Sequence, residues 1–457
     1  MLPSALFSYF VGWLSTFVFL DKTSELETQN KRLTFHLRHL HAHQGSRVLF
    51  SDIPSSNEDL DSIAPPNDGY TLQTRSRTSH KPRSHSDFLE ARRRSIRHAE
   101  SAPILWNAEE IEAPDVEHRE TLLTLAKMTY NAYIEPKDKD WYELGDKWTD
   151  NYPFGWEPDA DGFRGYVFST ADNSTVVLSI KGTSASYFGG SGGPTAKKDK
   201  LNGDHNLLFS CCCAHVDWTW TEVCSCYRGG WNCDLNCLQG SLVEESLFYP
   251  LGTNIYYNLT YMYPNANIWI VGHSLGGALA SLLGITFGVP VVAFESPGEK
   301  MASQRLHLPQ PPSTQHVTHV YHTADPIAMG TCNGIFSSCA LGGYAMESRC
   351  HLGESIIYDT ISNLSWASDV RTHTIATVIE KLLSAPWAPA VEQGREVPAP
   401  EIDEDCVVSC CGIFVFVSMI ADLLSCHCCP AGMLQMGIPR VCKRNTLDNF
   451  FYGTRTI

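Results

Sequence analysis

The sequence predicts an α/β fold with a central, mostly parallel sheet. First, the apolar run at 268–271 passes through a turn that contains one serine into a helix that includes Ala278. Second, two more buried strands follow at 289–294 and 316–322. Third, 457 residues allow one domain of about 250–300 residues with appendages. We therefore predict one large folded domain over residues 113–390.

The N-terminal region is predicted to lie in and beside a membrane. Residues 2–20 are an apolar run with no charge before Asp21 and no small-residue cleavage site after it. This pattern predicts an uncleaved transmembrane signal anchor over 1–20, with the body in a lumen. Residues 21–112 are predicted to be a luminal stem and disordered linker. Between 51 and 100 the chain is rich in Ser, Pro, Asn and Arg and poor in large apolar side chains.

Further elements follow from periodicity. Residues 33–39 alternate between apolar and polar side chains, as a strand does. Apolar residues recur at helical spacing over 122–130, so a helix is expected to cover one face of the sheet. The segments 162–168 and 175–181 are typical of a hairpin. Residues 242–263 are expected to form one helix before the 268–271 strand.

The cysteines and sequons indicate an oxidising compartment. The chain has 17 cysteines, which gather in a predicted insertion at 184–240, around 332–350, and in a predicted irregular, cysteine-rich tail at 391–457. Three N-glycosylation sequons begin at the residues Asn173, Asn258 and Asn363. Together they predict disulfides in a glycosylated luminal protein. Zinc and free thiols are the alternatives for the cysteines.

Charge and spacing exclude several classes of partner. With 34 Lys and Arg against 50 Asp and Glu, the net charge is −16, which argues against nucleic acid. The cysteine spacings match no common zinc template. Four histidines between residues 36 and 43 lack an accompanying acidic or cysteine ligand pattern, so we expect a solvated histidine-bearing strand or loop there. The sequence therefore predicts no metal site and no cofactor.

A serine at the strand-to-helix turn is the predicted nucleophile. The sequence Gly-His-Ser-Leu-Gly-Gly at 272–277 is typical of a nucleophile elbow, where side chains at the flanking glycines would collide with strand or helix. Ser274 is the nucleophile, and the amide of Leu275 at the helix N-terminus is available to an oxyanion. Thr183, at the end of the strand before the glycine-rich insertion, is the candidate second donor. An ordinary strand end is the alternative reading of Thr183.

The nucleophile needs a base and an orienting acid, which in this architecture follow in the order acid, then histidine. Asp325 is the predicted acid, because it lies just past a strand and is fixed by a following proline; a turn-capping aspartate is the alternative. His373 is the predicted base, because the apolar helix face after it would hold its loop in place. The weaker candidates are Asp359, Asp369 and His351.

These motifs resemble those of the class 3 lipases. The matching segments are Gly-His-Ser-Leu-Gly-Gly at 272–277, Lys-Gly-Thr at 181–183, Thr-Ala-Asp-Pro at 323–326 and Arg-Thr-His at 371–373. More narrowly, the chain is similar to the fungal autophagy-related vacuolar lipases. That similarity lies in the apolar N-terminus and in the segments 35–39, 211–214, 216–218 and 233–237.

The resemblance implies an α/β-hydrolase fold with a disulfide-rich insertion and an N-terminal membrane anchor. It implies a serine lipase that acts on membrane lipid, either triacylglycerol or phospholipid, in a single-pass type II membrane protein. It also implies passage through the endosome, or multivesicular body, and the prevacuolar compartment to the vacuole lumen, where autophagic bodies are broken open. Two alternatives remain open: an esterase for small soluble esters, and a membrane-tethered binding protein with an inactive hydrolase fold.

Overall fold

The computed structural model describes most of the predicted folded domain and part of the predicted stem. The described residues are 32–44, 47–52, 71–98, 100, 103–134, 140–142, 163–183, 208–210, 224–229, 232–245, 248–332, 337–342, 344, 346, 348–402 and 406. The predicted anchor at 1–20, most of the predicted insertion and the part of the predicted tail after residue 402, except Cys406, lie outside them. Within the described part, no helix has the length and apolar character needed to cross a membrane.

A ten-stranded sheet forms the centre of the molecule. Its order is β12-β11-β10-β9-β6-β5-β1-β3-β4, and β2 pairs with β1. The strands from β12 to β6 run parallel, and the other pairs are antiparallel. The bounds are β1 (Arg32–Gln44), β2 (Arg47–Asp52), β3 (Thr71–Pro82), β4 (Trp106–Pro114), β5 (Arg164–Thr170), β6 (Thr175–Ile180), β9 (Asn267–His273), β10 (Val291–Phe294), β11 (Val317–His322) and β12 (Glu354–Tyr358).

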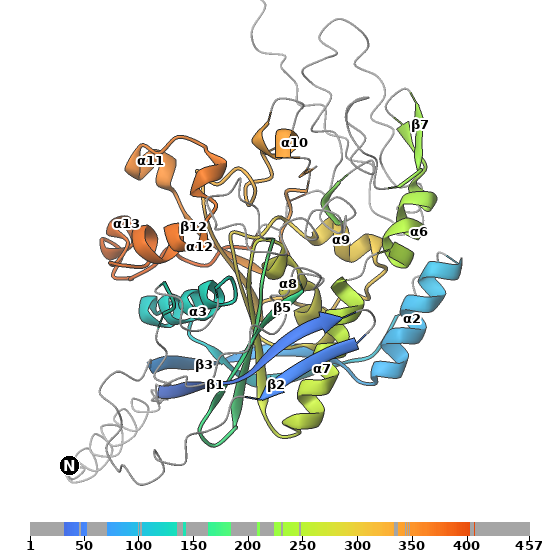
Figure 1. The fold of residues 1–457 in the computed structure, drawn as a ribbon, viewed down its shortest axis with the longest axis horizontal. Helices are drawn as coiled ribbons and strands as arrows, with labels where there is room; N and C mark the ends of the chain where they lie inside the picture. Colours follow the sequence, from blue (N-terminus) through green and yellow to red (C-terminus); the bar gives the residue numbers. More distant parts are fainter. Residues whose placement is uncertain are drawn as a thin grey trace, which may run out of the picture.

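Helices cover both faces of the sheet (Figure 1). On one face lie α3 (Arg119–Asn131), α12 (Ile375–Thr377) and the π-helical turn η3 (Val378–Leu382); on the other lie α7 (Phe248–Met262) and α8 (Leu275–Phe287). The alternation of strand side chains creates the two cores. In β9, Ile268 and Ile270 join the core under α7 and α8, whereas Trp269 and Val271 join the core under α3. The sequence-based prediction of an α/β fold is confirmed, with a mixed sheet whose half from β12 to β6 is parallel.

The predicted disordered linker is wrong over 71–98. This segment forms β3 and the helix α2 (His85–His98), and Leu72 and Phe88 are fully buried. The sequence hides β3 because its side chains are mainly polar. The strand is stabilised by backbone pairing with β4 and by an ion pair of 2.9 Å between Arg77 and Glu354 of β12. Because β1 also enters the sheet, the folded domain includes residues well before Ala113.

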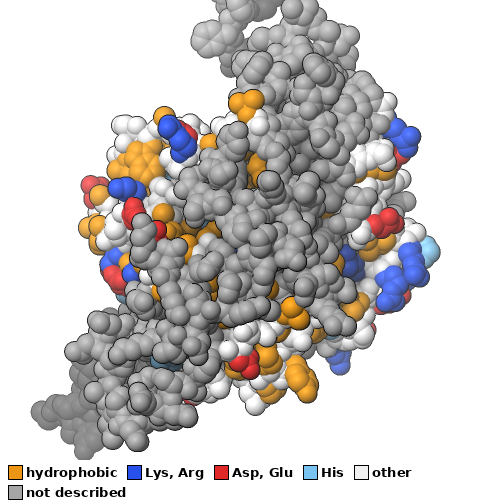
Figure 2. Space-filling model, in the orientation of Figure 1, with side chains coloured by type: hydrophobic (Ala, Val, Ile, Leu, Met, Phe, Trp, Pro, Cys, Tyr) orange, Lys and Arg blue, Asp and Glu red, His pale blue; other side chains and the backbone are white. Residues whose placement is uncertain are grey.

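Basic side chains gather on α2, at the right of the view in Figure 2. Phe88 and Ala91, three residues apart, are the buried residues of this helix, and its arginines lie mainly on the other side. Arg97 and His98 occupy the last turn, where positive charge complements the helix dipole. The helix is therefore a surface element fixed by one narrow apolar stripe.

Most of the other local predictions are confirmed. The alternating segment 33–39 lies within β1, the hairpin is β5 and β6, and the helix at 122–130 is α3. The single helix expected over 242–263 is wrong, because two helices, α6 (Leu235–Glu245) and α7, cover this region. Pro250 lies in the first turn of α7, where its missing N–H removes no intrahelical hydrogen bond.

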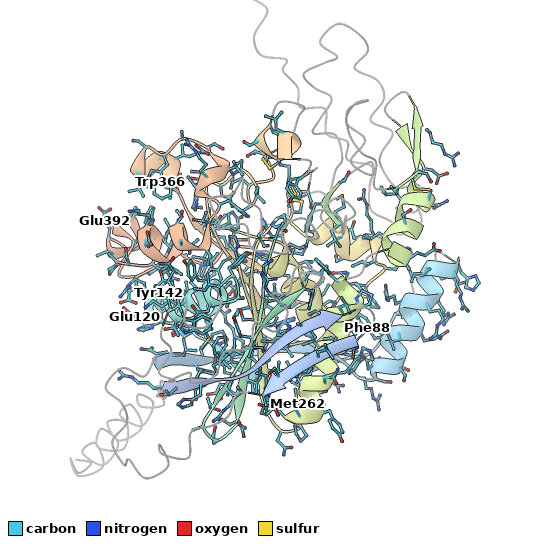
Figure 3. All side chains as sticks on the ribbon, in the orientation of Figure 1. Phe88, Glu120, Tyr142, Met262, Trp366 and Glu392 are labelled. Atoms are coloured by element: carbon cyan, nitrogen blue, oxygen red, sulfur yellow. A yellow bond between two sulfur atoms is a disulfide. The ribbon has the colours of Figure 1, made fainter. Side chains whose placement is uncertain are left out.

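Disulfides hold the loops on one side of the molecule, as the cysteine content predicts. They join Cys226 to Cys237, Cys332 to Cys339, and Cys350 to Cys406. Figure 3 shows disulfides as yellow bonds near α6 and α10 (Ser338–Gly342). The remaining short elements are β7 (Tyr227–Gly229), β8 (Asn232–Cys233), α9 (Lys300–Arg305), α11 (Thr360–Leu364), η2 (Val370–Thr372) and α13 (Ala388–Val391).

Candidate active site

The turn between β9 and α8 holds Ser274 in a strained conformation. Ser274 has φ 55° and ψ −128°, a region that residues with a side chain rarely adopt. The turn is tight because a Cβ at Gly272 would lie 2.3 Å from the carbonyl oxygen of Gly276. A Cβ at Gly276 would lie 2.3 Å from the carbonyl oxygen of Ile180. The two glycines are therefore required by backbone contacts, and the strain aims the serine at the carboxyl edge of the sheet.

The structure brings Ser274, His373 and Asp325 together. The Oγ of Ser274 lies 2.9 Å from Nε2 of His373, and Nδ1 of His373 lies 2.7 Å from Oδ2 of Asp325. The exposed fractions of the three residues are 7%, 1% and 0%. With Nδ1–H donating to the carboxylate, Nε2 presents its lone pair to the serine hydroxyl, which is the geometry of a nucleophile, a base and an orienting acid.

The loop that carries His373 is fixed on both sides. On one side, the hydroxyl of Thr372 donates to the carbonyl of Ala324 at 3.2 Å. On the other, Thr374 caps α12 by accepting from the amide of Thr377 at 3.1 Å. The apolar residues that follow, including Val378 and Leu382, are buried in the core under α3. The apolar face that the sequence shows after His373 is thus a packed face.

Asp325 is held as a carboxylate. Its Oδ1 accepts from the amide of Ile327 at 2.9 Å. Burial by itself raises the pKa of Asp325, but the His373 ring, its hydrogen bond and the hydrogen bond from Glu295 outweigh burial and hold the pKa well below its usual value. At any pH near neutrality, this side chain therefore presents negative charge to His373.

The weaker candidates lie elsewhere. Asp359 caps α11 by accepting from the amide of Ser362 at 3.1 Å, and Asp369 caps η2 by accepting from the amide of Arg371 at 2.8 Å. Nε2 of His351 lies 2.9 Å from the carbonyl oxygen of Ala328. The two aspartates have capping roles, and His351 belongs to a different cluster.

A second network joins the elbow to the predicted oxyanion loop. His273 lies 2.7 Å through Nε2 from the carbonyl oxygen of His373, and 2.8 Å through Nδ1 from the hydroxyl of Tyr133. The same hydroxyl accepts from the amide of Gly182 at 3.0 Å. Burial lowers the pKa of His273 to about 3, so the ring is neutral. Tyr133 is a residue that the sequence analysis missed, because it follows α3, far away in the chain.

The two predicted oxyanion donors lie beside the serine. Leu275 is the first residue of α8, so its amide is at the helix N-terminus. Thr183 is buried and follows Gly182, where an added Cβ would come within 3.2 Å of the Cβ of Ser274. The residue before Thr183 and the first residue of α8 therefore both lie next to Ser274.

Glu295 is a second residue that the sequence did not reveal. It follows β10, is fully buried and has φ 42°. Burial raises its pKa well above the usual value, and the neighbouring Asp325 carboxylate and their hydrogen bond raise it further. Protonation of Glu295 is thus favoured, and a protonated carboxyl group can donate to Asp325 instead of repelling it. In the sequence, Glu295 begins the segment Glu-Ser-Pro-Gly, which is typical of a loop and does not indicate a catalytic neighbour.

The three sequons fall at different depths. Asn173 lies in the turn between β5 and β6, and Asn363 lies in α11; both are exposed. Asn258 is half-buried in α7, where its amide donates to the carbonyl of Asn254 at 2.8 Å. Asn173 and Asn363 are therefore the more accessible acceptors for a glycan.

A cavity of about 300 Å³ lies at the opposite edge of the sheet. It is lined by the starts of β9 and β10, including Asn267 and Pro290, and by Tyr256 of α7. Ligand sites in open α/β sheets lie at the carboxyl ends of the parallel strands. The position of this cavity thus distinguishes it from the site around Ser274.

Comparisons with known proteins agree with the elbow. A family model described as "Lipase (class 3)" matches residues 253–330. A "Putative lipase ATG15" of Cryptococcus neoformans var. neoformans serotype D (strain B-3501A) is 58% identical over 294 residues, 64% of this chain and 56% of that protein. A protein of the same name from Mycosarcoma maydis is 41% identical over 419 residues, 86% of this chain and 78% of that protein.

The chain thus spans little more than half the length of the Cryptococcus relatives that it matches, 56% and 54% of them. Among solved structures, the Lip2 lipase from Yarrowia lipolytica is 12% identical with a TM-score of 0.27, over 58% of this chain and 91% of that one. A TM-score this low does not establish a common fold. The evidence for the fold is instead the strand order and the turn at Ser274.

Proposed function

Because this chain belongs to the fungal ATG15 family of lipases, we propose that it hydrolyses ester bonds of lipids with Ser274 as the nucleophile. The relay of 2.9 Å and 2.7 Å from Ser274 through His373 to Asp325 carries this proposal. A strained serine at the carboxyl edge of a parallel sheet supports it, since strain of this kind is retained where chemistry uses it.

The first half of the reaction transfers the acyl group to the serine. Oγ of Ser274 attacks the ester carbonyl while Nε2 of His373 takes its proton. The amides of Leu275 and Thr183 hold the negative oxygen of the tetrahedral intermediate. His373, now positively charged, is stabilised by the Asp325 carboxylate. It returns the proton to the leaving alcohol, and an acyl-serine remains.

Water completes the cycle by the same route. His373 removes a proton from a water molecule, whose oxygen attacks the acyl-serine carbonyl. The second tetrahedral intermediate collapses, releases the fatty acid and returns the proton to Ser274. Neutral His273 has a positioning role, because it contacts the backbone of the His373 loop and, through Tyr133, the amide of Gly182.

The substrate we propose is membrane lipid, triacylglycerol or phospholipid, inside the vacuole. The names of the relatives include both a lipase and ATG15. Disulfides and two exposed sequon asparagines support a luminal body. We further propose that residues 1–20 anchor this body as a type II membrane protein that reaches the vacuole through the endosome.

Covalent labelling tests the nucleophile. A serine-directed fluorophosphonate should label the wild-type chain at Ser274 and should not label Ser274→Ala. His373→Ala should lower the labelling rate by roughly 10³-fold or more, because the serine loses its base. Folded wild-type protein that takes up no label would instead support the inactive binding protein.

A substrate panel tests the lipid specificity. Emulsified triacylglycerol and phospholipid vesicles should be hydrolysed faster than a short soluble ester, each measured by fatty-acid release at acidic and neutral pH. Ser274→Ala is the control for contaminating hydrolases. A preference for the soluble ester would show the esterase alternative to be correct.

A further inference from the structure

A second polar cluster, distinct from the residues around Ser274, lies buried beside β11. It consists of Glu299, His319 and His351, and one ligand atom from each lies within 4.8 Å of the others. Their side chains are 0%, 1% and 8% exposed. Glu299 precedes α9, His319 is in the middle of β11, and His351 lies just before β12. The sequence did not predict this grouping, because the three residues are far apart along the chain.

The contacts of His351 define its tautomer. Its Nε2 lies 2.9 Å from the carbonyl oxygen of Ala328, which can only accept, so Nε2 carries the hydrogen. In the neutral ring, Nδ1 then carries a lone pair. Nδ1 lies 3.7 Å from Oε2 of Glu299. Among the described residues, neither of these two atoms has a hydrogen-bond partner. Two buried acceptors that face each other are unfavourable unless a cation or a proton lies between them.

His319 presents the same arrangement. Its Nδ1 lies 3.1 Å from the hydroxyl oxygen of Ser296. Its Nε2 lies 3.0 Å from Oε1 of Glu299, which also accepts from the amide of Leu352 at 3.1 Å. Each histidine therefore contacts a protein oxygen with one ring nitrogen and directs the other at Glu299. Histidines that bind metal ions are oriented in this way.

We propose that Glu299, His319 and His351 bind a zinc ion. Ligand atoms of a tetrahedral zinc site, at bond lengths of about 2.0–2.1 Å, lie about 3.3 Å from one another. Oε1 of Glu299 lies 3.0 Å from Nε2 of His319, and Oε2 lies 3.7 Å from Nδ1 of His351. With one ligand atom from each residue, the three atoms lie within 4.8 Å of one another, so the side chains would move closer together around the ion. Two imidazoles and a carboxylate are zinc ligands, whereas calcium and magnesium take oxygen ligands. The ion also compensates the buried carboxylate.

The proposed ion would join three segments of the chain. It links the start of α9, the strand β11 and the loop before β12, which the Cys350–Cys406 disulfide also closes. Ser281 of α8 lies 3.4 Å from Nε2 of His319. The site is thus a structural tie behind the elbow helix, built from residues that the proposed hydrolysis does not use.

Metal analysis tests the site directly. The full chain, purified without added metal or chelator, should contain about one zinc ion per molecule by mass spectrometry. X-ray absorption should show nitrogen and oxygen neighbours near 2.0 Å and no sulfur shell at about 2.3 Å. His351→Gln and Glu299→Gln should each lose the zinc. His316→Gln, at a buried histidine that contacts the carbonyl of Gly284 instead, is the matched control and should keep it.

The wild-type chain provides a readout that does not depend on a variant that folds. Removing zinc with a chelator should lower the Tm by several degrees, and stoichiometric zinc should restore it. Folded protein without zinc, whose Tm does not rise on addition of the ion, overturns the proposal and leaves a histidine–glutamate ion pair. A sulfur shell overturns it as well, because the metal then lies on cysteines. Labelling at Ser274 is measured separately, so failure here leaves the proposed hydrolysis intact.

Discussion

Glu295 has a positive φ at the edge of the sheet and lies next to Asp325, the acid of the proposed catalytic trio. We expect Glu295→Gln to keep activity near wild type, because its amide still donates to Asp325. Glu295→Ala removes a hydrogen bond to a charged group, so kcat/KM should fall by about 10- to 100-fold. Steady-state kinetics on one ester substrate, with circular dichroism to confirm folding, measure both.

The pH profile separates this role from simple packing. Because Asp325 and burial raise the pKa of Glu295, wild-type activity should decline on the alkaline side as the proton is lost and two carboxylates face each other. Glu295→Gln cannot ionise and should not show that decline. Identical alkaline limbs in the two proteins would rule out a titrating Glu295.

The buried ring of His41 makes the free energy of unfolding depend on pH. Burial lowers its pKa from 6.5 to about 4. Below pH 6.5 the unfolded chain therefore binds a proton that the folded chain refuses, and stability falls as pH drops toward 4. The loss is about 1.4 kcal/mol per pH unit at most, roughly 3 kcal/mol over that window. His41→Gln should make this slope shallower in urea unfolding series at pH 7, 5.5 and 4.5, and the other buried histidines, such as His273, keep their own contributions.

The exposed His98→Gln variant is the control for His41, because it removes a histidine without removing a buried one. Its slope should equal that of the wild type. If His41→Gln keeps the wild-type slope too, another group is responsible for the acid sensitivity.

At the scale of elements, the elbow depends on the backbone approach at Gly276. Gly276→Ala would place a Cβ 2.3 Å from the carbonyl of Ile180. We expect a loss in the free energy of unfolding on the order of 3 kcal/mol and loss of fluorophosphonate labelling. Gly240→Ala in α6, where a Cβ meets nothing within 4 Å, should be neutral or add up to about 1 kcal/mol. Equal changes in the free energy of unfolding would show that helix propensity, and not the tight turn, determines the effect of Gly276→Ala.

The elements that were predictable are those whose signal is local. The strand at 268–271 and the helix after it follow from apolar composition and two glycines. Proline after Asp325, and an apolar face after His373, likewise lie within a few residues of the groups they place. In contrast, β3 has few large apolar residues, and it is a strand because β1 and β4 pair with it. Pairing between distant segments leaves no periodic trace in the sequence.

The same distinction applies to the candidate site. The sequence predicted a nucleophile, a base and an acid, because each follows a recognisable strand end or turn. Tyr133 and Glu295 act through contacts to His273 and Asp325 that only the folded chain creates. The cluster of Glu299, His319 and His351 was missed for the same reason, since ligands from three segments show no spacing rule.

At the scale of the whole molecule, the N-terminal strands are part of the hydrolase sheet. A chain that begins at residue 32 should fold, whereas one that begins at Ala113 should aggregate. The shorter chain lacks β1 and β3, loses the buried Phe35 and Leu72, and exposes the edge of β5. Secreted yield, aggregation by light scattering and Tm by calorimetry measure the difference. A shorter chain with an unchanged Tm would contradict the assignment of these strands to the core.

The start of β1 at Arg32 also limits where the enzyme can work. Between the proposed anchor at 1–20 and that strand lie only residues 21–31, which reach at most about 40 Å when fully extended. With the proposed anchor in place, this linker would keep the start of β1 within that distance of the bilayer. The start of β1 lies near the amino ends of β6 and β9, whereas Ser274 follows the carboxyl end of β9, so the serine would lie at the edge of the sheet away from the tether.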